Sequence, residues 1–154
     1  KNFRIVHILG DTLDPKFNNK KNKNYIPIAF TNEIAALMQN CDLVISRAGS
    51  GAINEIIKTK SPSILIPYPN AKNNHQEKNA LILSSTGCSI MIEQNKNLEI
   101  NLKRNLKRIF NMETNKSKNQ YEILDLMRNN IAEFKFKDAR KEIKKIINSY
   151  KKNL

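Results

Sequence analysis

The sequence has few of the residues that build disulfide scaffolds, metal centres or membrane spans. Among 154 residues there are two cysteines, two histidines and no tryptophan. Cys41 and Cys88 lie far apart without CxxC spacing, so neither a zinc site nor a redox pair is indicated, and we expect buried free thiols in a reducing compartment. No apolar run reaches the ~18 residues that span a bilayer, and no signal peptide is visible. These absences predict a soluble, cytoplasmic protein.

Motifs of several enzyme classes are also missing. There is no Gly-Lys-Ser/Thr phosphate loop, no GxSxG element and no Cys/His pair at recognisable spacing. The Asp-x-Asp element that holds a divalent metal on a sugar nucleotide is absent too. We therefore expect no metal site, no cofactor and no catalytic base in this chain. His7 lies inside an apolar run, where a structural role with a backbone hydrogen bond is the simpler interpretation.

Negative charge is scarce, because 14 Asp and Glu stand against 27 Lys and Arg, which gives a net charge of +13. Such an excess suits nucleic acid or an anionic membrane surface. It is equally explained by a composition rich in Lys and Asn throughout. The cations concentrate in 103–108 and 135–152, without the interleaved aromatic residues that stack on single strands. We therefore expect an anionic membrane surface rather than nucleic acid as a partner.

Short apolar runs and amphipathic patterns predict alternating strands and helices. The predicted strands are 3–9, 25–30, 42–46, 63–66 and 89–92. The predicted helices are 31–40, capped by Thr31, then Gly51 to Lys60, 75–85, 98–110, 120–130 and 139–150. Short, continuously apolar strands separated by helices are typical of a parallel sheet covered on both faces. We predict one α/β domain with a Rossmann-like, doubly wound parallel sheet, with Pro27 in an edge strand.

The first candidate site is SRAGSGAINE, from Ser46 to Glu55, where a predicted strand ends and a helix begins. In open α/β sheets, ligands bind beyond the carboxyl ends of the strands. Small residues let the backbone approach a ligand, and the N–H groups of a first helical turn favour a phosphate. Glu55 can accept hydrogen bonds from a ribose diol, and Arg47 would add positive charge. A tight turn followed by a dipole-favoured Glu55 explains the pattern equally well.

The second candidate site is PYPNAKNNHQEKNA, from Pro67 to Ala80, which again follows a strand and opens a helix. Gln76 donates and accepts hydrogen bonds at once, which suits sugar hydroxyls. His75 suits a sugar or a phosphate. On the pattern alone, a helix capped by Asn74 with a solvated His-Gln pair is the favoured interpretation.

Taken together, DLVISRAGSGAINEI and PSILIPYPNAKNNHQEKNA closely resemble the MurG family of UDP-GlcNAc-dependent N-acetylglucosaminyltransferases. FRIVHILG is similar to the second strand of that family's carboxyl-terminal domain, and the helix with Ala139, Ile143 and Ile146 is similar to its last helix. The resemblance implies that 1–154 is the carboxyl-terminal, UDP-GlcNAc-binding domain of a GT-B fold. Because the sequence starts at Lys1 rather than Met, we expect the amino-terminal, acceptor-binding domain to lie outside this chain.

The resemblance also implies a donor site. Ser50, Gly51 and Ala52 would face the nucleotide and its diphosphate. Glu55 would hold the ribose hydroxyls, Gln76 would read the GlcNAc hydroxyls, and Thr31 would lie by the uracil. The full implied set is Thr31, Ser50, Gly51, Ala52, Ile53, Asn54, Glu55 and Gln76, with Arg47, Gly49 and His75 as further candidates.

The activity implied by the resemblance is inverting transfer of GlcNAc from UDP-GlcNAc to lipid I, forming lipid II in peptidoglycan synthesis. It implies a peripheral protein at the cytoplasmic face of the inner membrane, with a lipid-linked acceptor held by the other domain. The catalytic base belongs to that domain, so we expect no transfer by this chain alone. The alternative is a stand-alone donor-binding subunit that docks on a membrane-anchored partner.

Overall fold

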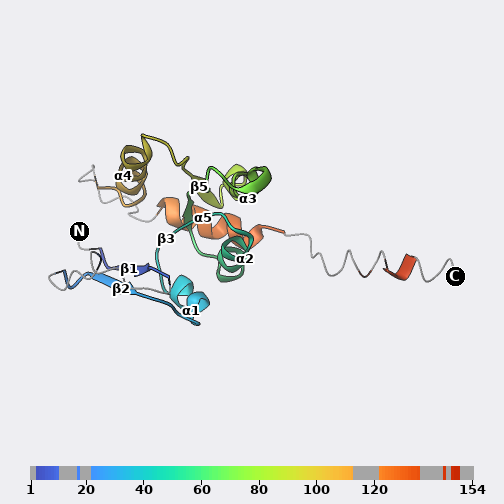
Figure 1. The fold of residues 1–154 in the computed structure, drawn as a ribbon, viewed down its shortest axis with the longest axis horizontal. Helices are drawn as coiled ribbons and strands as arrows, with labels where there is room; N and C mark the ends of the chain where they lie inside the picture. The colour runs from blue at the N-terminus through green and yellow to red at the C-terminus, as the bar shows by residue number, and fades with distance from the viewer. Residues whose placement is uncertain are drawn as a thin grey trace.

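The computed structural model of the chain describes residues 3–10, 17, 22–112, 122–135, 144 and 147–149 (Figure 1). Its strands are β1 (Ile5–Ile8), β2 (Tyr25–Ile28), β3 (Val44–Ser46), β4 (Ser63–Leu65) and β5 (Ser89–Met91). Its helices are α1 (Ile34–Gln39), α2 (Ser50–Thr59), α3 (His75–Ser85), α4 (Leu98–Ile109) and α5 (Glu122–Glu133), with a 3-10 turn, η2 (Lys72–Asn74), before α3. All five predicted strands are present. Of the predicted helix 139–150, only Lys144 and 147–149 are described, and these are helical; the rest lies outside the described residues.

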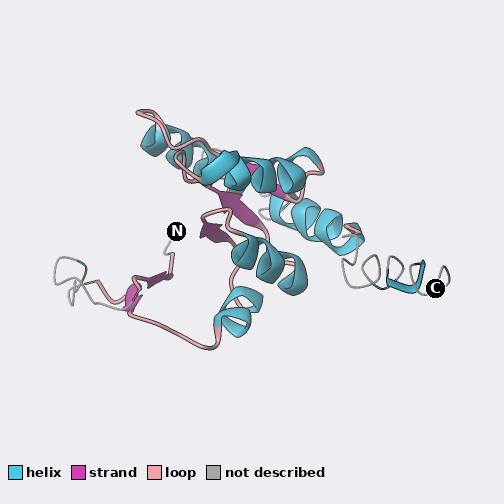
Figure 2. Cartoon of the chain, turned by 45° about the vertical axis from the view of Figure 1, so that its right-hand side comes forward, coloured by secondary structure: helices cyan, strands magenta, loops and turns pink. Residues whose placement is uncertain are grey.

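All pairs among the described strands are parallel, as predicted. β1 pairs with β2, β3 with β4 and β4 with β5. The described strands form two sheets, in the orders β1-β2 and β3-β4-β5, where we expected one continuous sheet. Figure 2 shows the first pair apart from the other three strands. Among the described strands, β1 and β3 therefore each have a hydrogen-bonded neighbour on one side only.

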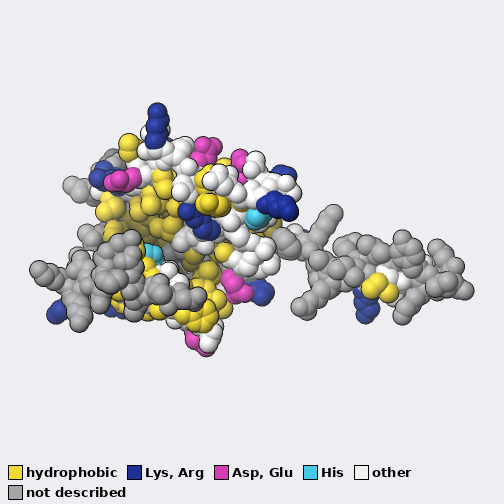
Figure 3. All heavy atoms as spheres, viewed as in Figure 1, with side chains coloured by type: hydrophobic (Ala, Val, Ile, Leu, Met, Phe, Trp, Pro, Cys, Tyr) yellow, Lys and Arg dark blue, Asp and Glu magenta, His cyan; other side chains and the backbone are white. Residues whose placement is uncertain are grey.

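Apolar side chains on these two strands are exposed. Ile5 of β1 is 54% exposed and Ile45 of β3 is 48% exposed, whereas Ile64 and Leu65 of the central strand β4 are at 0%. Strands of a parallel α/β sheet are normally buried on both faces. Figure 3 shows hydrophobic side chains gathered between the β1–β2 pair and α4. Apolar side chains on this face are therefore exposed, whereas those of the central strand are buried.

The three-stranded sheet carries a hydrophobic core on each face. Leu65 packs into a cluster with residues of α2 and α3, whereas its neighbour Ile64 packs into a cluster with residues of α4. α5 joins both clusters, through Ile131 and Leu124 respectively. Figure 1 draws α4 apart from α2 and α3, with β3 and β5 between them. Burial of each such side chain stabilises the fold by ~1.5–3 kcal/mol, and the two-sided covering confirms the Rossmann-like α/β prediction.

Two local predictions need correction. α1 begins at Ile34, because the Thr31 hydroxyl accepts the N–H of Glu33 at 2.9 Å and forms a turn ahead of the helix instead of a cap. His7 has a side-chain partner where we expected a backbone group: its Nδ1 lies 2.7 Å from the hydroxyl of Tyr25. Both residues still have structural roles.

Candidate functional site

The two predicted segments meet at one edge of the three-stranded sheet. Val44, Ser63 and Ser89 are aligned across β3, β4 and β5. Because the strands are parallel, the loops 47–49, 66–74 and 92–97 that follow them all leave from the same, carboxyl edge. This is where ligands bind in open α/β sheets.

The start of α2 presents free backbone donors toward open space. Gly49 is extended (φ −65°, ψ 153°), and no side chain caps the helix. The first i→i−4 bond runs from the N–H of Ile53 to the Gly49 carbonyl at 3.0 Å. The N–H groups of residues 50–52 precede it and so have no acceptor within the helix. A Cβ added at Gly49 or Gly51 would meet no other part of the chain within 4 Å, so backbone donors and helix dipole are open to an anion.

Arg47, in the loop 47–49, hydrogen-bonds to residues of the other two loops. Its Nη1 donates to the carbonyls of Ile66 (3.1 Å) and Pro67 (3.4 Å) and to Oε1 of Gln94. Its Cζ lies 5.8 Å from the centroid of the Tyr68 ring, within cation–π range. We predicted that Arg47 adds charge at the mouth of the site, and the structure gives its guanidinium a framework role as well.

Asn79 lies within the second candidate segment, but the sequence pattern assigned it no role. Its Nδ2 donates to the carbonyl of Ala48 at 3.0 Å, which anchors the loop before α2 on α3. Ala48 is fully buried, so its carbonyl needs this protein donor. The two residues are 31 positions apart, and no local spacing signals the contact.

Gln76 and His75 have defined orientations at the start of α3. Oε1 of Gln76 accepts the N–H of Tyr68 at 3.0 Å, which leaves its Nε2 to donate elsewhere. Nδ1 of His75 lies 2.7 Å from the Lys72 carbonyl. Since a carbonyl only accepts, Nδ1 is the donor in this contact, and Nε2 is left for another partner. Asn74 makes no side-chain cap, contrary to the interpretation that the sequence pattern alone favoured.

Glu55 lies in the second turn of α2, four residues beyond Gly51 and so on the same helix face. Its side chain is 29% exposed, and its Oε1 is 3.4 Å from Nζ of Lys58. The first turn of α2 holds no acidic residue, so dipole stabilisation of a first-turn acid does not explain Glu55. An ion pair with so exposed a Lys58 contributes little, and only Oε1 of the carboxylate is engaged in it.

Ile53, Asn54 and Thr31 differ in their access to this edge. The side chain of Ile53 is 6% exposed in the core, and its N–H donates to the Gly49 carbonyl. Its place in the donor site stays a prediction. Asn54 is exposed on α2. Thr31 follows β2 of the other sheet, and the described hydrogen bonds do not join it to the loops at 47–49 and 66–74.

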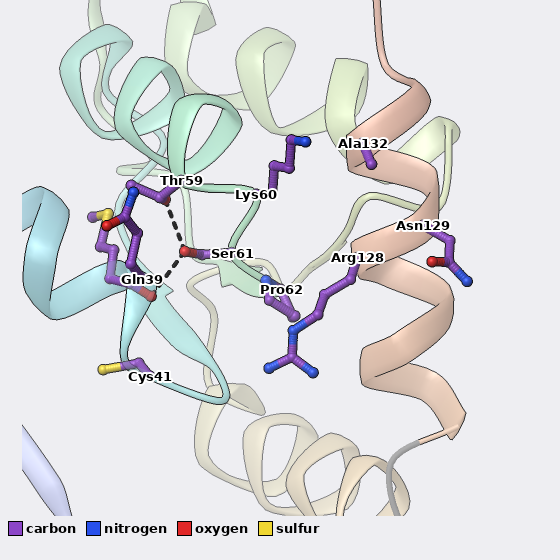
Figure 4. A pocket seen from close by; sticks show the side chains of 10 residues that line it. Gln39, Cys41, Thr59, Lys60, Ser61, Pro62, Arg128, Asn129 and Ala132 are labelled. Atoms are coloured by element: carbon purple, nitrogen blue, oxygen red, sulfur yellow. Dashed lines mark hydrogen bonds between the residues drawn. The ribbon is translucent and has the colours of Figure 1, made fainter.

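A cavity of ≈ 330 Å³ lies at the opposite edge of the sheet, between α1, the end of α2 and α5 (Figure 4). Within it, the hydroxyl of Ser61 donates to the Met38 carbonyl (2.9 Å) and bonds Thr59 Oγ1 (2.8 Å). Burial is the main cause that raises the pKa of the Cys41 thiol above its ordinary value, and the nearby Asp42 carboxylate raises it further. The predicted site residues do not line this cavity.

Among the described residues, no group of three or more His, Cys, Asp and Glu could hold a metal ion, and no helix is long and apolar enough to cross a bilayer.

The fold and its edge loops define a Rossmann-like α/β domain of the kind that takes a ligand beyond the carboxyl ends of its strands. Residues 1–143 match the model of the glycosyltransferase family 28 C-terminal domain. The chain belongs to this family.

Relatives agree with this assignment and confirm the resemblance to MurG. The chain is 56% identical over 152 residues to the UDP-N-acetylglucosamine–N-acetylmuramyl-(pentapeptide) pyrophosphoryl-undecaprenol N-acetylglucosamine transferase of Prochlorococcus marinus strain MIT 9312, covering 99% of the chain and 42% of the relative. The protein of the same name from strain MIT 9211 is 36% identical, with 88% and 38% covered. The crystal structure of Acinetobacter baumannii MurG matches with a TM-score of 0.66 at 20% identity, over 81% of this chain and 35% of that one. The chain thus spans about two fifths of the length of these curated relatives.

Proposed function

We propose that this chain is the donor-binding half of an inverting glycosyltransferase that moves GlcNAc from UDP-GlcNAc to lipid I, undecaprenyl-pyrophosphoryl-MurNAc-pentapeptide, and so forms lipid II in peptidoglycan synthesis. The observation that carries the proposal is the 56% identity, over nearly the whole chain, to an enzyme named for a GlcNAc transfer of this kind. That relative holds the domain within a chain more than twice as long, so the alternative of a stand-alone subunit is not favoured.

The diphosphate of the donor would lie at the amino end of α2. The N–H groups of residues 50–52 supply donors there, and the open space before Gly49 and Gly51 lets an anion reach the backbone. Arg47 and Asn79 would act as positioning residues, because they hold the loops around this helix end.

The rest of the nucleotide sugar would meet three side chains. Glu55 would accept hydrogen bonds from the ribose hydroxyls, on the helix face shared with Gly51. Gln76 would donate through Nε2 to the GlcNAc hydroxyls, since its oxygen is already engaged by Tyr68. His75 would contact the sugar or a phosphate through Nε2, and Thr31 would lie beyond them, by the uracil.

During transfer the acceptor hydroxyl would attack the anomeric carbon of GlcNAc while the bond to the UDP oxygen breaks, which inverts the configuration. Negative charge then grows on the leaving diphosphate. Preorganised backbone donors stabilise such charge because they need no reorganisation during the reaction. We propose that these donors replace a metal ion, so a chelator should leave UDP affinity unchanged; a tenfold loss on adding EDTA would contradict this.

We place the enzyme at the cytoplasmic face of the inner membrane as a peripheral protein. A lipid-linked acceptor lies in a bilayer, whereas a nucleotide sugar is dissolved in the cytoplasm. The two meet at the cytoplasmic surface of the membrane. An acceptor site and a catalytic base would come from a second domain.

A chimaera tests the proposal. The matching 152 residues of the Prochlorococcus marinus MIT 9312 relative are replaced by this chain, and transfer of labelled GlcNAc to lipid I is measured. We expect lipid II to form, and Glu55→Ala to lower kcat/KM by on the order of 10- to 100-fold through loss of charged hydrogen bonds. A folded chimaera that makes no lipid II, while the intact relative does, would contradict the proposal.

A further inference from the structure

We propose that Arg47 sets the preference of the donor site for the sugar, because it fixes which end of the Gln76 amide faces the ligand. In this proposal Arg47 is a positioning residue that acts on Gln76 through one peptide group, the one between Pro67 and Tyr68. The inference rests on the proposed function, in which Gln76 contacts the hydroxyls of GlcNAc. It gives Arg47 a role that is separate from its charge.

The peptide group between Pro67 and Tyr68 is held at both ends. Its carbonyl accepts a hydrogen bond from Nη1 of Arg47 at 3.4 Å, and its N–H donates to Oε1 of Gln76 at 3.0 Å. In a trans peptide the carbonyl and the N–H lie in one plane and point in opposite directions, so Arg47 and Gln76 contact the peptide from opposite sides. A charged donor at the carbonyl also polarises the peptide and strengthens its N–H as a donor. The contact of Arg47 therefore supports the contact of Gln76.

The orientation of this peptide decides what Gln76 offers to a ligand. A backbone N–H can only donate, so the atom of Gln76 that faces Tyr68 has to be the oxygen, and the Nε2 donor is left for another partner. If the peptide turned over, its carbonyl would face Gln76 instead. The amide would then donate through Nε2 to that carbonyl and offer its oxygen to the ligand. One peptide group thus selects between a donor and an acceptor at this position.

The surrounding segment restricts this peptide without fixing its orientation. Pro67 and Pro69 flank Tyr68; the proline ring fixes φ of Pro67, and a residue before proline favours extended conformations. The Tyr68 carbonyl accepts the N–H of Ala71 at 3.2 Å. These constraints still allow rotation about the two bonds beside the peptide, ψ of Pro67 and φ of Tyr68. Among the described residues, Arg47 supplies the donor that holds the Pro67 carbonyl.

The guanidinium of Arg47 is suited to hold this peptide. Its Nη1 also donates to the Ile66 carbonyl at 3.1 Å and to Oε1 of Gln94, and its Cζ lies 5.8 Å from the centroid of the Tyr68 ring. The described ion pairs do not include Arg47, so pairing with a carboxylate does not explain its place. A lysine here would keep the charge, but its nitrogen would end one bond short of Nη1, and it lacks the planar group that stacks on an aromatic ring.

Calorimetry on charge-preserving variants tests the proposal. Arg47→Lys is matched by Arg104→Lys, the same change on α4, where Arg104 donates to Oδ1 of Asn101. UDP and UDP-GlcNAc are titrated into each folded variant, and the ratio of the two dissociation constants gives the sugar preference. We expect Arg47→Lys to weaken UDP-GlcNAc about tenfold and UDP less than about threefold, because the charge stays while the hydrogen bond to the sugar is lost. Arg104→Lys should leave both affinities unchanged. Equal weakening of both ligands by Arg47→Lys, or no change in either, overturns the proposal.

A double-mutant cycle shows whether Arg47 acts through Gln76. Gln76→Glu keeps an oxygen for the N–H of Tyr68 but has no Nε2 donor, so the orientation of the amide no longer matters to the sugar. In the Gln76→Glu background, Arg47→Lys should change the sugar preference by less than about twofold, against about tenfold in the wild-type background. The same loss in both backgrounds would show that Arg47 does not act through Gln76.

Hydrogen exchange tests the contact without any ligand. The chain has four tyrosines, so isotopic labelling of tyrosine alone gives few amide signals, and the signal of Tyr68 can be followed by NMR. An amide that loses its hydrogen bond exchanges faster with water. We expect the N–H of Tyr68 to exchange on the order of tenfold faster in Arg47→Lys and at the wild-type rate in Arg104→Lys. A wild-type rate in Arg47→Lys overturns the proposal.

The two kinds of measurement separate this inference from the proposed function. A wild-type chain that binds UDP and UDP-GlcNAc, with a sugar preference that Arg47→Lys does not alter, overturns the inference alone. Suppose instead that the folded wild-type chain binds neither nucleotide, while Arg47→Lys speeds the exchange of the Tyr68 N–H. The action of Arg47 on this peptide is then supported, and the proposed function is overturned.

Discussion

Gly51 is a residue whose identity the folding of the chain does not explain. It lies in the first turn of α2, where Ala is favoured over Gly by ~1 kcal/mol, and an added Cβ meets open space. If that space takes a diphosphate, Gly51→Ala should keep or raise the thermal midpoint while lowering UDP affinity at least about tenfold. Thermal unfolding and calorimetry of the same sample measure both effects.

Gly87 provides the matched control for that experiment. Its φ is +70°, and a Cβ there would lie 2.5 Å from Nδ2 of Asn130. Gly87→Ala should therefore destabilise the fold by roughly 1–3 kcal/mol and leave UDP affinity of the folded protein unchanged. A Gly51→Ala variant that binds UDP as well as the wild type does would contradict the proposal that the diphosphate lies at the amino end of α2.

Cys41 has a raised pKa, caused first by burial and second by Asp42. The thiolate is the reactive form, so iodoacetamide at pH 8 should modify Cys41 more slowly than free glutathione, and Asp42→Asn should speed the reaction. As the pH rises, the thiol loses its proton in the unfolded chain before it does so in the folded protein. The free energy of unfolding should therefore fall as the pH rises above 9.0, the ordinary pKa of this thiol. Cys41→Ser should remove that part of the decline. Mass spectrometry and urea unfolding across pH 8–10 check the two effects.

At the level of elements, α3 holds the loop before α2 through one hydrogen bond. Asn79→Ala leaves the buried Ala48 carbonyl without its donor, which should cost about 1–3 kcal/mol of unfolding free energy and weaken UDP binding severalfold as the loop shifts. Asn105→Ala removes a similar amide-to-carbonyl bond, to Asn101 within α4, and should leave UDP affinity unchanged. Equal UDP affinities in both variants and the wild type would show that Asn79 does not position the site.

The elements were largely predictable from sequence, whereas the contacts of the site were not. Short apolar runs located all five strands to within two residues at either end, because the strands of a parallel α/β sheet are typically apolar at successive positions. The pattern also gave the bounds of α3. The contacts of Arg47 with Gln94 and of Asn79 with Ala48 join residues 47 and 31 positions apart. Such contacts depend on how the loops come together in the folded chain, and sequence periodicity does not predict them.

At the level of the whole molecule, the described strands form two sheets with open edges. Periodicity predicted strands but could not say which strands pair, because pairing depends on the chain path. Unpaired parallel edges with exposed Ile5 and Ile45 favour association with other chains. We expect the isolated chain to self-associate at micromolar concentrations. The variant I5K/I45K should be monomeric by sedimentation velocity and the control L126K should not; identical behaviour of the two would contradict an edge-mediated contact.

The most direct measurement of the central claim is calorimetric titration of UDP and UDP-GlcNAc into this chain. Glu55→Ala should weaken both ligands by on the order of 10-fold or more, since both carry the ribose. Gln76→Glu keeps the oxygen that accepts from Tyr68 but removes the Nε2 donor, so it should weaken UDP-GlcNAc about tenfold while UDP binds almost as before. A folded chain that binds neither ligand, or variants that bind both as the wild type does, would contradict the donor site at the carboxyl edge of β3 and β4.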